Sequence, residues 1–295
     1  IGFIPVEKES ESVSKTLEYA YDDWTIAQMA NFMGEQEDYK TFIERSQNYI
    51  NVFDPTTKFM RGRFRNTWFA PFDPYEVNFN YTEANSWQYS FYVPHDITGF
   101  MNLLGGKDQL EKQLDNLFTA NDKTSGREQA DITGLIGQYA HGNEPSHHMA
   151  YLYNFVNKPY KTQEKTRQIL TELYTNSPDG ISGNEDCGQM SAWYIFSSLG
   201  FYPVTPGSNQ YIIGSPLFDK ATIHLEGGKL FTVEAKNNSL ENKYIKNVQL
   251  NNKAYPYSYL KHSDIVNGGN LVFEMTDRPT NWGTSDDFIP STEIK

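Results

Sequence analysis

The chain has one cysteine, no run of lysine or arginine, and no long apolar stretch. Cys187 is alone among 295 residues, so an internal disulfide is excluded and pairing says nothing about the redox compartment. The net charge of −12, without a local basic cluster, repels polyphosphates and argues against a nucleic-acid partner. Nothing approaches the roughly twenty consecutive apolar residues that cross a bilayer, so no membrane span is predicted.

The sequence also begins at Ile1 without a methionine or a signal segment. We therefore expect either a processed chain or a piece of a longer one, and favour the second. Aromatic residues, in contrast, are abundant, with 20 Tyr and 19 Phe. Flat rings match the C–H faces of sugars, so this composition is typical of carbohydrate-binding proteins, although a tightly packed helical core would also use it.

Apolar spacing near the start of the chain predicts an amphipathic helix. Steps of four and three residues separate Val13, Leu17, Ala20, Trp24 and Ala27. Ser12 is its expected N-cap and Gly34 its expected end. Further helices are predicted over residues 39–49, 84–92, 107–118, 145–155, 161–174 and 188–199. Residues 68–80 read as an aromatic loop because two prolines interrupt them.

The pattern changes after Gly200, where proline and glycine punctuate short β-rich runs. Strands are predicted over residues 210–213, 221–225, 230–235, 244–250 and 270–275. We therefore expect a mainly α fold, with a helical portion over residues 1–203 and a β-rich region over 204–295. The order of the helices suggests hairpins stacked side by side, as in helical barrels whose loops form a cavity at one end.

Three segments concentrate carboxylates, amides, histidines and aromatic rings, at residues 80–89, 141–148 and 183–194. Glycoside hydrolysis needs two carboxyl groups on opposite sides of a sugar. Glu83, the Asn143–Glu144 pair and Asp186 each come directly before a predicted helix. Helical hairpins between them would allow these groups to converge on one rim.

Asp186 has the features of a general base. It precedes a predicted helix start, where unpaired N–H groups and the helix dipole stabilise a negative charge. An N-cap aspartate without a catalytic role is the alternative. Glu185 is a second candidate for the base, and Asn184 is placed to orient the water or a hydroxyl group.

Glu83 has the opposite requirement if it acts as a general acid, because its pKa must be raised so that it keeps a proton. The aromatic side chains Tyr81, Trp87 and Tyr89 would supply an apolar wall that does this. A helix starting at Ala84 would instead lower the pKa, and a capping glutamate beside core aromatics is the alternative.

The segment 141–148 contains three of the six histidines. Its spacing lacks the arrangement of common zinc sites, so zinc is not favoured. Asn143 and Glu144 offer hard oxygen ligands of the kind that calcium accepts. The same residues, followed by Pro145, read equally well as a helix cap with proline at the first helical position.

Several long motifs in order resemble the C-terminal catalytic portion of glycoside hydrolase family 92, calcium-dependent exo-acting α-mannosidases. The resemblance covers nearly the whole chain. It rests on Val6–Lys8, Ser12–Trp24, Tyr81–Tyr89, Val93–Asp96, His141–His147, Gly183–Tyr194, Gly200–Val204, Tyr211–Pro216 and Trp282–Gly283.

The resemblance implies an inverting mechanism, with Glu83 as the acid and Asp186 as the base. Asn184 is expected to contribute, although some members of the family carry an acid at this position. A calcium ion that contacts two mannose hydroxyls is expected at Glu144 and Asn143. The expected sugar contacts are Trp87, His95, Asp96, His147 and Gln189.

The family's fold is an N-terminal β-sandwich packed on an (α/α)6-type helical barrel. By this resemblance, residues 1–203 are part of the barrel, and the sandwich and the first barrel helices are absent. We expect release of terminal mannose from α-mannosides, as in N-glycan processing, by a secreted protein of the periplasm or the extracellular space. A non-catalytic calcium-dependent carbohydrate-binding fragment is the alternative, and a barrel lyase or phosphorylase is a third interpretation.

Overall fold

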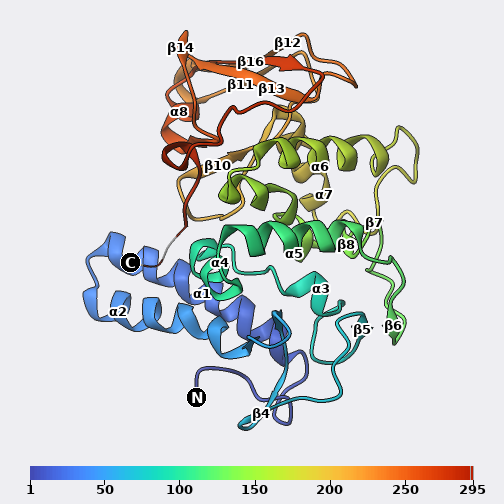
Figure 1. Cartoon of the computed structure of the whole chain (residues 1–295). Helices are drawn as coiled ribbons and strands as arrows, with labels where there is room; N and C mark the ends of the chain where they lie inside the picture. The colour runs from blue at the N-terminus through green and yellow to red at the C-terminus, as the bar shows by residue number, and fades with distance from the viewer. Residues whose placement is uncertain (293, 295) are drawn as a thin grey trace. The chain divides into compact units, whose positions relative to one another are not determined.

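The computed structural model describes residues 1–292 and 294 (Figure 1). The chain forms two compact units, Ile1–Ser146 with the described residues from Thr292 onward, and His147–Ser291. The change from helices to strands near residue 200 therefore lies inside the second unit, and does not mark its border.

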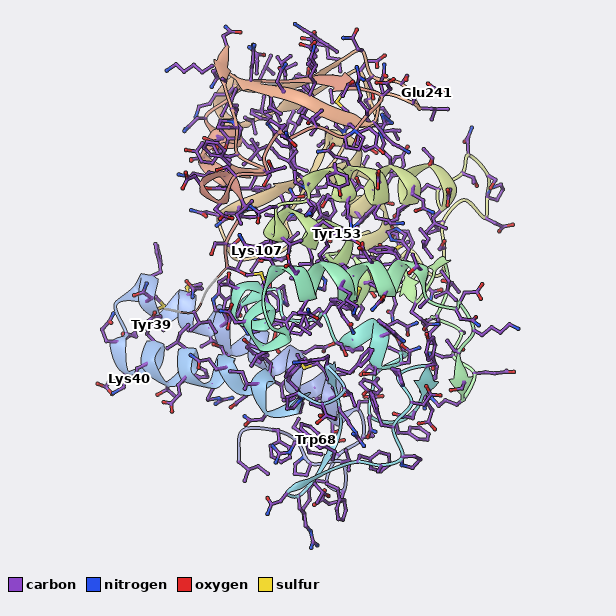
Figure 2. The ribbon with its side chains drawn as sticks, in the orientation of Figure 1. Tyr39, Lys40, Trp68, Lys107, Tyr153 and Glu241 are labelled. Carbon is purple, nitrogen blue, oxygen red and sulfur yellow. The ribbon has the colours of Figure 1, made fainter. Side chains whose placement is uncertain are left out.

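The first unit begins with a long helical hairpin. Helix α1 (Ser12–Met33) packs against α2 (Gln36–Arg45) and the 3-10 helix η1 (Ser46–Val52), and Tyr39 and Lys40 mark α2 in Figure 2. The predicted apolar stripe of α1 is buried, which confirms the first helix. Gly34 ends it in the left-handed conformation, as expected, whereas Ser12 is its first residue and Glu11 precedes it.

Short strands and helices complete the first unit. They are β1 (Phe53–Asp54), β2 (Phe59–Met60), β3 (Arg63–Phe64), β4 (Thr67–Trp68), β5 (Glu76–Val77), α3 (Ser86–Tyr89), α4 (Ile97–Leu104), α5 (Lys107–Thr119), β6 (Ser125–Gly126), β7 (Leu135–Ile136), β8 (Tyr139–Ala140) and η2 (Glu144–Ser146). The helix predicted over 84–92 is a single turn, α3. Helix α4 was not predicted from the sequence.

The second unit opens with η3 (Met149–Val156), followed by α6 (Pro159–Glu172) and α7 (Gln189–Leu199). The prediction of one helix over 145–155 is wrong, because two 3-10 segments occupy this stretch. Every residue of η3 is buried, including Tyr153 (Figure 2). Helix α6 begins with Pro159. Proline is suited to the first helical position because a backbone N–H there would have no partner within the helix.

The strands of the second unit form two sheets. The first has the order β15 (Tyr259–Lys261), β10 (Gln210–Ile213), β9 (Phe201–Tyr202). The second has the order β11 (Lys220–His224), β12 (Leu230–Lys236), β16 (Gly269–Thr276), β13 (Tyr244–Leu250), β14 (Lys253–Ala254). The short helices η4 (Glu226–Gly228), α8 (His262–Val266) and η5 (Asp286–Phe288) lie in the connections.

All five predicted strands are confirmed, with ends shifted by one residue at most. The strands of the larger sheet pair antiparallel except for β12 with β16, which run parallel. Alternate residues of these two strands point into one apolar core, namely Phe231, Val233, Ala235, Leu271, Phe273 and Met275. The mixture of helices and small sheets agrees with the predicted class, and the (α/α)6-type barrel stays a prediction. Across residues 1–292 and 294, no helix has the length and apolarity needed to cross a membrane.

Candidate active site

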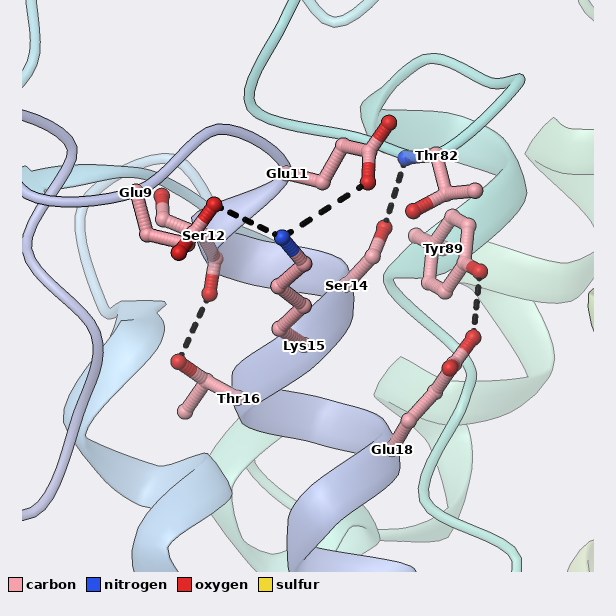
Figure 3. Close-up of polar contacts among 9 residues, drawn as sticks. All are labelled: Glu9, Glu11, Ser12, Ser14, Lys15, Thr16, Glu18, Thr82 and Tyr89. Carbon is pink, nitrogen blue, oxygen red and sulfur yellow. Dashed lines mark hydrogen bonds and ion pairs between the residues drawn. The ribbon is translucent and has the colours of Figure 1, made fainter.

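Glu83 lies on a strained turn that is attached to other parts of the first unit. Its φ of 52° is in the left-handed region, which side chains other than glycine, asparagine and aspartate rarely adopt. The backbone N–H of Thr82 donates to the hydroxyl of Ser14 on α1 at 2.9 Å (Figure 3). The side-chain amide of Asn143 donates to the carbonyl oxygen of Glu83 at 3.5 Å. Strained residues persist where their surroundings hold them, and they cluster at functional sites.

Asn85, and not Glu83, caps the helix that follows. Its side-chain oxygen accepts from the N–H of Gln88 at 3.2 Å, and the Gln88 side chain accepts from the N–H of Asn85 at 3.0 Å. The alternative of a capping role for Glu83 is therefore wrong. The helix begins at Ser86, two residues later than expected. The positive end of the helix dipole, which would favour the charged form of a carboxyl group, therefore lies farther from Glu83 than the sequence suggested.

The three aromatic residues expected around Glu83 are buried in the first unit. Trp87 packs edge-on against Phe59, with ring centroids 4.6 Å apart, and its indole nitrogen has no hydrogen-bond partner. Tyr89 donates its hydroxyl to Glu18 at 2.5 Å (Figure 3), and burial raises the pKa of that glutamate. The sugar contact expected of Trp87 stays a prediction.

His95 and Asp96 are also inside the first unit and have structural partners. The Nε2 atom of His95 lies 2.9 Å from the carbonyl oxygen of Ser46, and burial lowers the pKa of the imidazole to about 4, so the ring is neutral at pH 7. Asp96 caps α4, because one of its carboxylate oxygens accepts from the N–H of Gly99 at 3.0 Å. The other oxygen accepts from the hydroxyl of Tyr49 at 2.7 Å. Both oxygens of Asp96 therefore have a protein donor, and the sugar contacts of His95 and Asp96 stay predictions.

In the second unit, Glu185 and Asp186 have different surroundings. Glu185 accepts from the N–H groups of Gly188 at 2.5 Å and of Ser191 at 3.2 Å. The hydrogen bonds from Ser191 and Gly188 hold the pKa of Glu185 below its usual value. Glu185 thus satisfies the N-terminus of α7, which begins at Gln189. The N-cap alternative for Asp186 is wrong, since Gly188 is the N-cap and Glu185 supplies the side chain.

Asp186 begins a run of three left-handed residues. The φ angles are 53° for Asp186, 55° for Cys187 and 104° for Gly188. Asp186 and Asn184 are exposed, on either side of the anchored Glu185. The carbonyl oxygen of Asp186 accepts from the N–H of Gln189 at 3.2 Å, and the residue is exposed to solvent, where a base has access to water.

Gln189 and His147 are brought together beside this loop. The side-chain amide of Gln189 donates to Nδ1 of His147 at 3.0 Å and to the hydroxyl of Tyr202 at 3.3 Å. Because Nδ1 accepts, the proton of a neutral ring is on Nε2. The indole N–H of Trp193 donates to the His147 carbonyl at 3.0 Å and fixes the backbone. The structure therefore confirms that these two residues are neighbours, and their contact with a sugar stays a prediction.

Asn143 and Glu144 lie at the start of η2 in the first unit. Asn143 is half-buried and Glu144 is exposed, and both carry hard oxygen atoms. No group of three or more His, Cys, Asp or Glu side chains that could hold a metal occurs among residues 1–292 and 294. A cation held at this pair would take its other ligands from carbonyls, water or substrate hydroxyls. Calcium accepts such a mixed oxygen shell, so the pair fits calcium in ligand type.

Residues 1–277 match the model of the glycosyl hydrolase family 92 catalytic domain. The chain belongs to glycosyl hydrolase family 92. The family predicted from the sequence motifs is therefore confirmed. Because the match covers most of the chain, both acid-bearing loops lie inside the family's catalytic domain.

Solved structures of the family are similar to this family 92 chain over its whole length. The GH92 alpha-mannosidase BT3965 from Bacteroides thetaiotaomicron, in complex with mannoimidazole, is 45% identical with a TM-score of 0.93, and the match covers 99% of this chain and 40% of that one. The GH92 inverting mannosidase BT2199 from the same organism is 37% identical with a TM-score of 0.90, and the match covers 100% and 41%.

A curated relative from Arthroderma benhamiae, described as an uncharacterized secreted glycosidase, is 28% identical over 98% of this chain and 40% of its own length. The family 92 chain thus spans about 40% of the length of each of these relatives.

Sequence reasoning missed two buried polar residues of the family 92 chain, Asn85 and Gln138, which hydrogen-bond to each other at 2.8 Å. The sequence does contain a signal for the first, since Asn85 followed three residues later by Gln88 is a capping-box pattern. Gln138 lies 53 residues further along, and no local pattern announces a contact over that separation.

Proposed function

We propose that this chain carries the catalytic carboxyl groups of an exo-acting α-mannosidase that releases terminal mannose from α-mannosides of glycans. The observation that carries the proposal is that, in the turn before α3 and in the loop before α7, a neighbouring residue and not the proposed catalytic acid or base caps the helix. Asn85 and Glu185 cap the helices, whereas Glu83 and Asp186 have left-handed backbones and no capping role. Family membership and the named activities of the solved relatives support the substrate class.

In the proposed reaction, Glu83 donates its proton to the departing glycosidic oxygen. Asp186 accepts a proton from a water molecule as that water attacks the anomeric carbon on the opposite face. One bond to the anomeric carbon forms as the other breaks, so the configuration inverts and mannose is released. Asn184, exposed two residues before Asp186, would accept or donate a hydrogen bond that orients the water or a sugar hydroxyl.

Asn143 and Glu144 would hold calcium, whose role when bound is to bind and orient sugar hydroxyl oxygens. His147 would contact the substrate, with its ring held in place by the Gln189 side chain at Nδ1. Trp87, His95 and Asp96 are the other sugar contacts in the proposal. We also propose a periplasmic or extracellular location and a role in N-glycan processing, and the secreted relative supports the former.

A non-catalytic calcium-dependent carbohydrate-binding fragment is the second candidate, which would use the oxygen ligands of Asn143 and Glu144 and would need no acid and base. Hydrolysis of an α-mannobioside, with the anomer of the released mannose followed by NMR, separates the two. The proposal expects β-mannose as the first product. Chelation should abolish turnover and added calcium should restore it. Mannoside binding without hydrolysis would favour the fragment, and release of α-mannose would refute inversion.

A further inference from the structure

We propose that Gln138 is a positioning residue that holds the Glu83 turn in its productive geometry. This inference rests on the proposed function of Glu83. Gln138 and Asn85 are both fully buried in the first unit. The side-chain amide of Asn85 donates to the side-chain oxygen of Gln138 at 2.8 Å. Since Asn85 also caps α3, Gln138 fixes the residue that determines where the Glu83 turn ends and the helix begins.

Both the nitrogen and the oxygen of the Gln138 side-chain amide are hydrogen-bonded. Its nitrogen donates to the carbonyl oxygens of Asn121 at 2.6 Å and of Lys123 at 3.2 Å, while its oxygen accepts from Asn85. Two carbonyl groups on one side and an N–H donor on the other allow only one orientation of the amide. Both polar atoms of this buried amide thus have partners, and a shift of the Gln138 side chain would break at least one of these hydrogen bonds.

The backbone of Gln138 is fixed by a tight hairpin. Gly137 and Gln138 form the two-residue turn between β7 and β8, and Gly137 has a φ of 60°, as a glycine-first hairpin turn requires. A Cβ at Gly137 would lie 2.4 Å from the carbonyl oxygen of Leu117, so the turn rests directly on α5. The N–H of Gln138 donates to that same carbonyl oxygen at 2.8 Å.

After this hairpin, the chain makes a second contact with the turn that carries Glu83. Asn143, five residues after Gln138, donates to the carbonyl oxygen of Glu83. The segment 138–143 therefore contacts the turn on both sides of Ala84, at Glu83 and at Asn85. From α1, Ser14 holds Thr82. A general acid that must meet one oxygen atom depends on this kind of support, since a displacement of about 1 Å can reduce the rate 10²-fold.

Gln138→Leu tests the proposal in the full chain. Gln163→Leu is the matched control, because Gln163 is also buried and accepts one backbone N–H, from Ile245 at 3.0 Å, but lies in the second unit on α6. We expect Gln138→Leu to lower kcat about 10- to 100-fold with little change in KM. Hydrogen exchange at the N–H groups of Asn85 and Gln88 should accelerate, whereas the control should leave both kcat and these two amides unchanged.

Gln138→Glu allows a second measurement, the pH dependence of kcat, which a general loss of stability would not change in the expected way. A carboxylate facing two carbonyl oxygens has its pKa raised, and only its protonated form offers a donor to them. The ratio of kcat for this variant to the wild-type kcat should therefore increase as the pH falls. A Gln138→Leu variant with wild-type kcat, or unchanged exchange at Asn85 and Gln88, overturns the proposal. An inactive wild type would refute the proposed function instead, and the exchange result would still decide whether Gln138 holds the turn.

Discussion

The neighbouring residues Glu185 and Asp186 should give opposite results when each loses its charge. Glu185 bonds two N–H groups at the start of α7, whereas Asp186 is exposed and is not the cap. We expect Asp186→Asn to remove activity and preserve the melting temperature. We expect Glu185→Gln to lower the melting temperature and retain most of the wild-type kcat.

The choice of substitutions follows from the backbone. Asp186 has a φ of 53°, and asparagine tolerates this left-handed conformation better than alanine does, so Asp186→Asn changes the charge without adding backbone strain. Loss of a general base reduces kcat by about 10²- to 10⁴-fold. Glutamine at position 185 keeps one acceptor oxygen but lacks the charge that strengthens bonds to backbone N–H groups.

The assay is mannose release from an α-mannobioside, measured as kcat and KM, together with a thermal unfolding curve for each variant. If Glu185→Gln lost as much activity as Asp186→Asn while remaining folded, Glu185 would be the base and our reading of its bonds would be wrong. If Asp186→Asn lowered the melting temperature strongly, its loss of activity would say nothing about catalysis.

Three further outcomes follow from the first unit. Glu83→Gln should reduce kcat for substrates with a poor leaving group much more than for an aryl mannoside, whose leaving group needs no proton; equal losses for both substrates would argue against an acid role. Tyr49→Phe removes a buried hydrogen bond to Asp96, which should cost about 1.5–3 kcal/mol of unfolding free energy. Urea unfolding measures this, and a loss below about 0.5 kcal/mol would show that the pair contributes little. For Asp54, burial raises the pKa, but the N–H of Thr56 and the Arg61 side chain outweigh this and leave it lowered. Its stabilising contribution is therefore present above the pKa of the unfolded chain, near 4, and is lost as the pH falls through the lower folded value. Asp54→Asn should flatten the acid limb of the stability curve between about pH 5 and 2, and an unchanged limb would contradict this reasoning.

Elements with regular apolar spacing were predictable from the sequence. Helix α1 has a periodic apolar stripe and a glycine at its end. The five predicted strands are short β-rich runs that turn residues separate from one another. Helix α4 was missed because it is only eight residues long and has Gly99 in its first turn. That glycine is required by packing, since a Cβ there would lie 2.2 Å from a carboxylate oxygen of Asp96 and 2.6 Å from the hydroxyl of Tyr49. Such a contact cannot be read from local propensity.

The candidate site was predictable in its residue types but not in its local roles. The local pattern left both Glu185 and Asp186 as candidates for the base, because both precede the same helix, and the choice of Asp186 rested on the resemblance to the family. The bonds from Gly188 and Ser191 to Glu185 show which of the two caps the helix. The same is true of Glu83 and Asn85, where one backbone turn decides which side chain is the cap. In each case the geometry of two or three residues, which composition does not encode, assigns the capping role.

The position of β16 in the larger sheet has a consequence for biosynthesis. Of the five strands of this sheet it is the last in chain order, yet it lies between β12 and β13 and pairs with both. Until residue 276 has been translated, these two strands have no partner on their inner edges, and their apolar residues have no finished core to enter. During synthesis, the unpaired edges of β12 and β13 can therefore pair with strands of other chains. The yield of folded protein in cells should depend on chaperones that shield these edges.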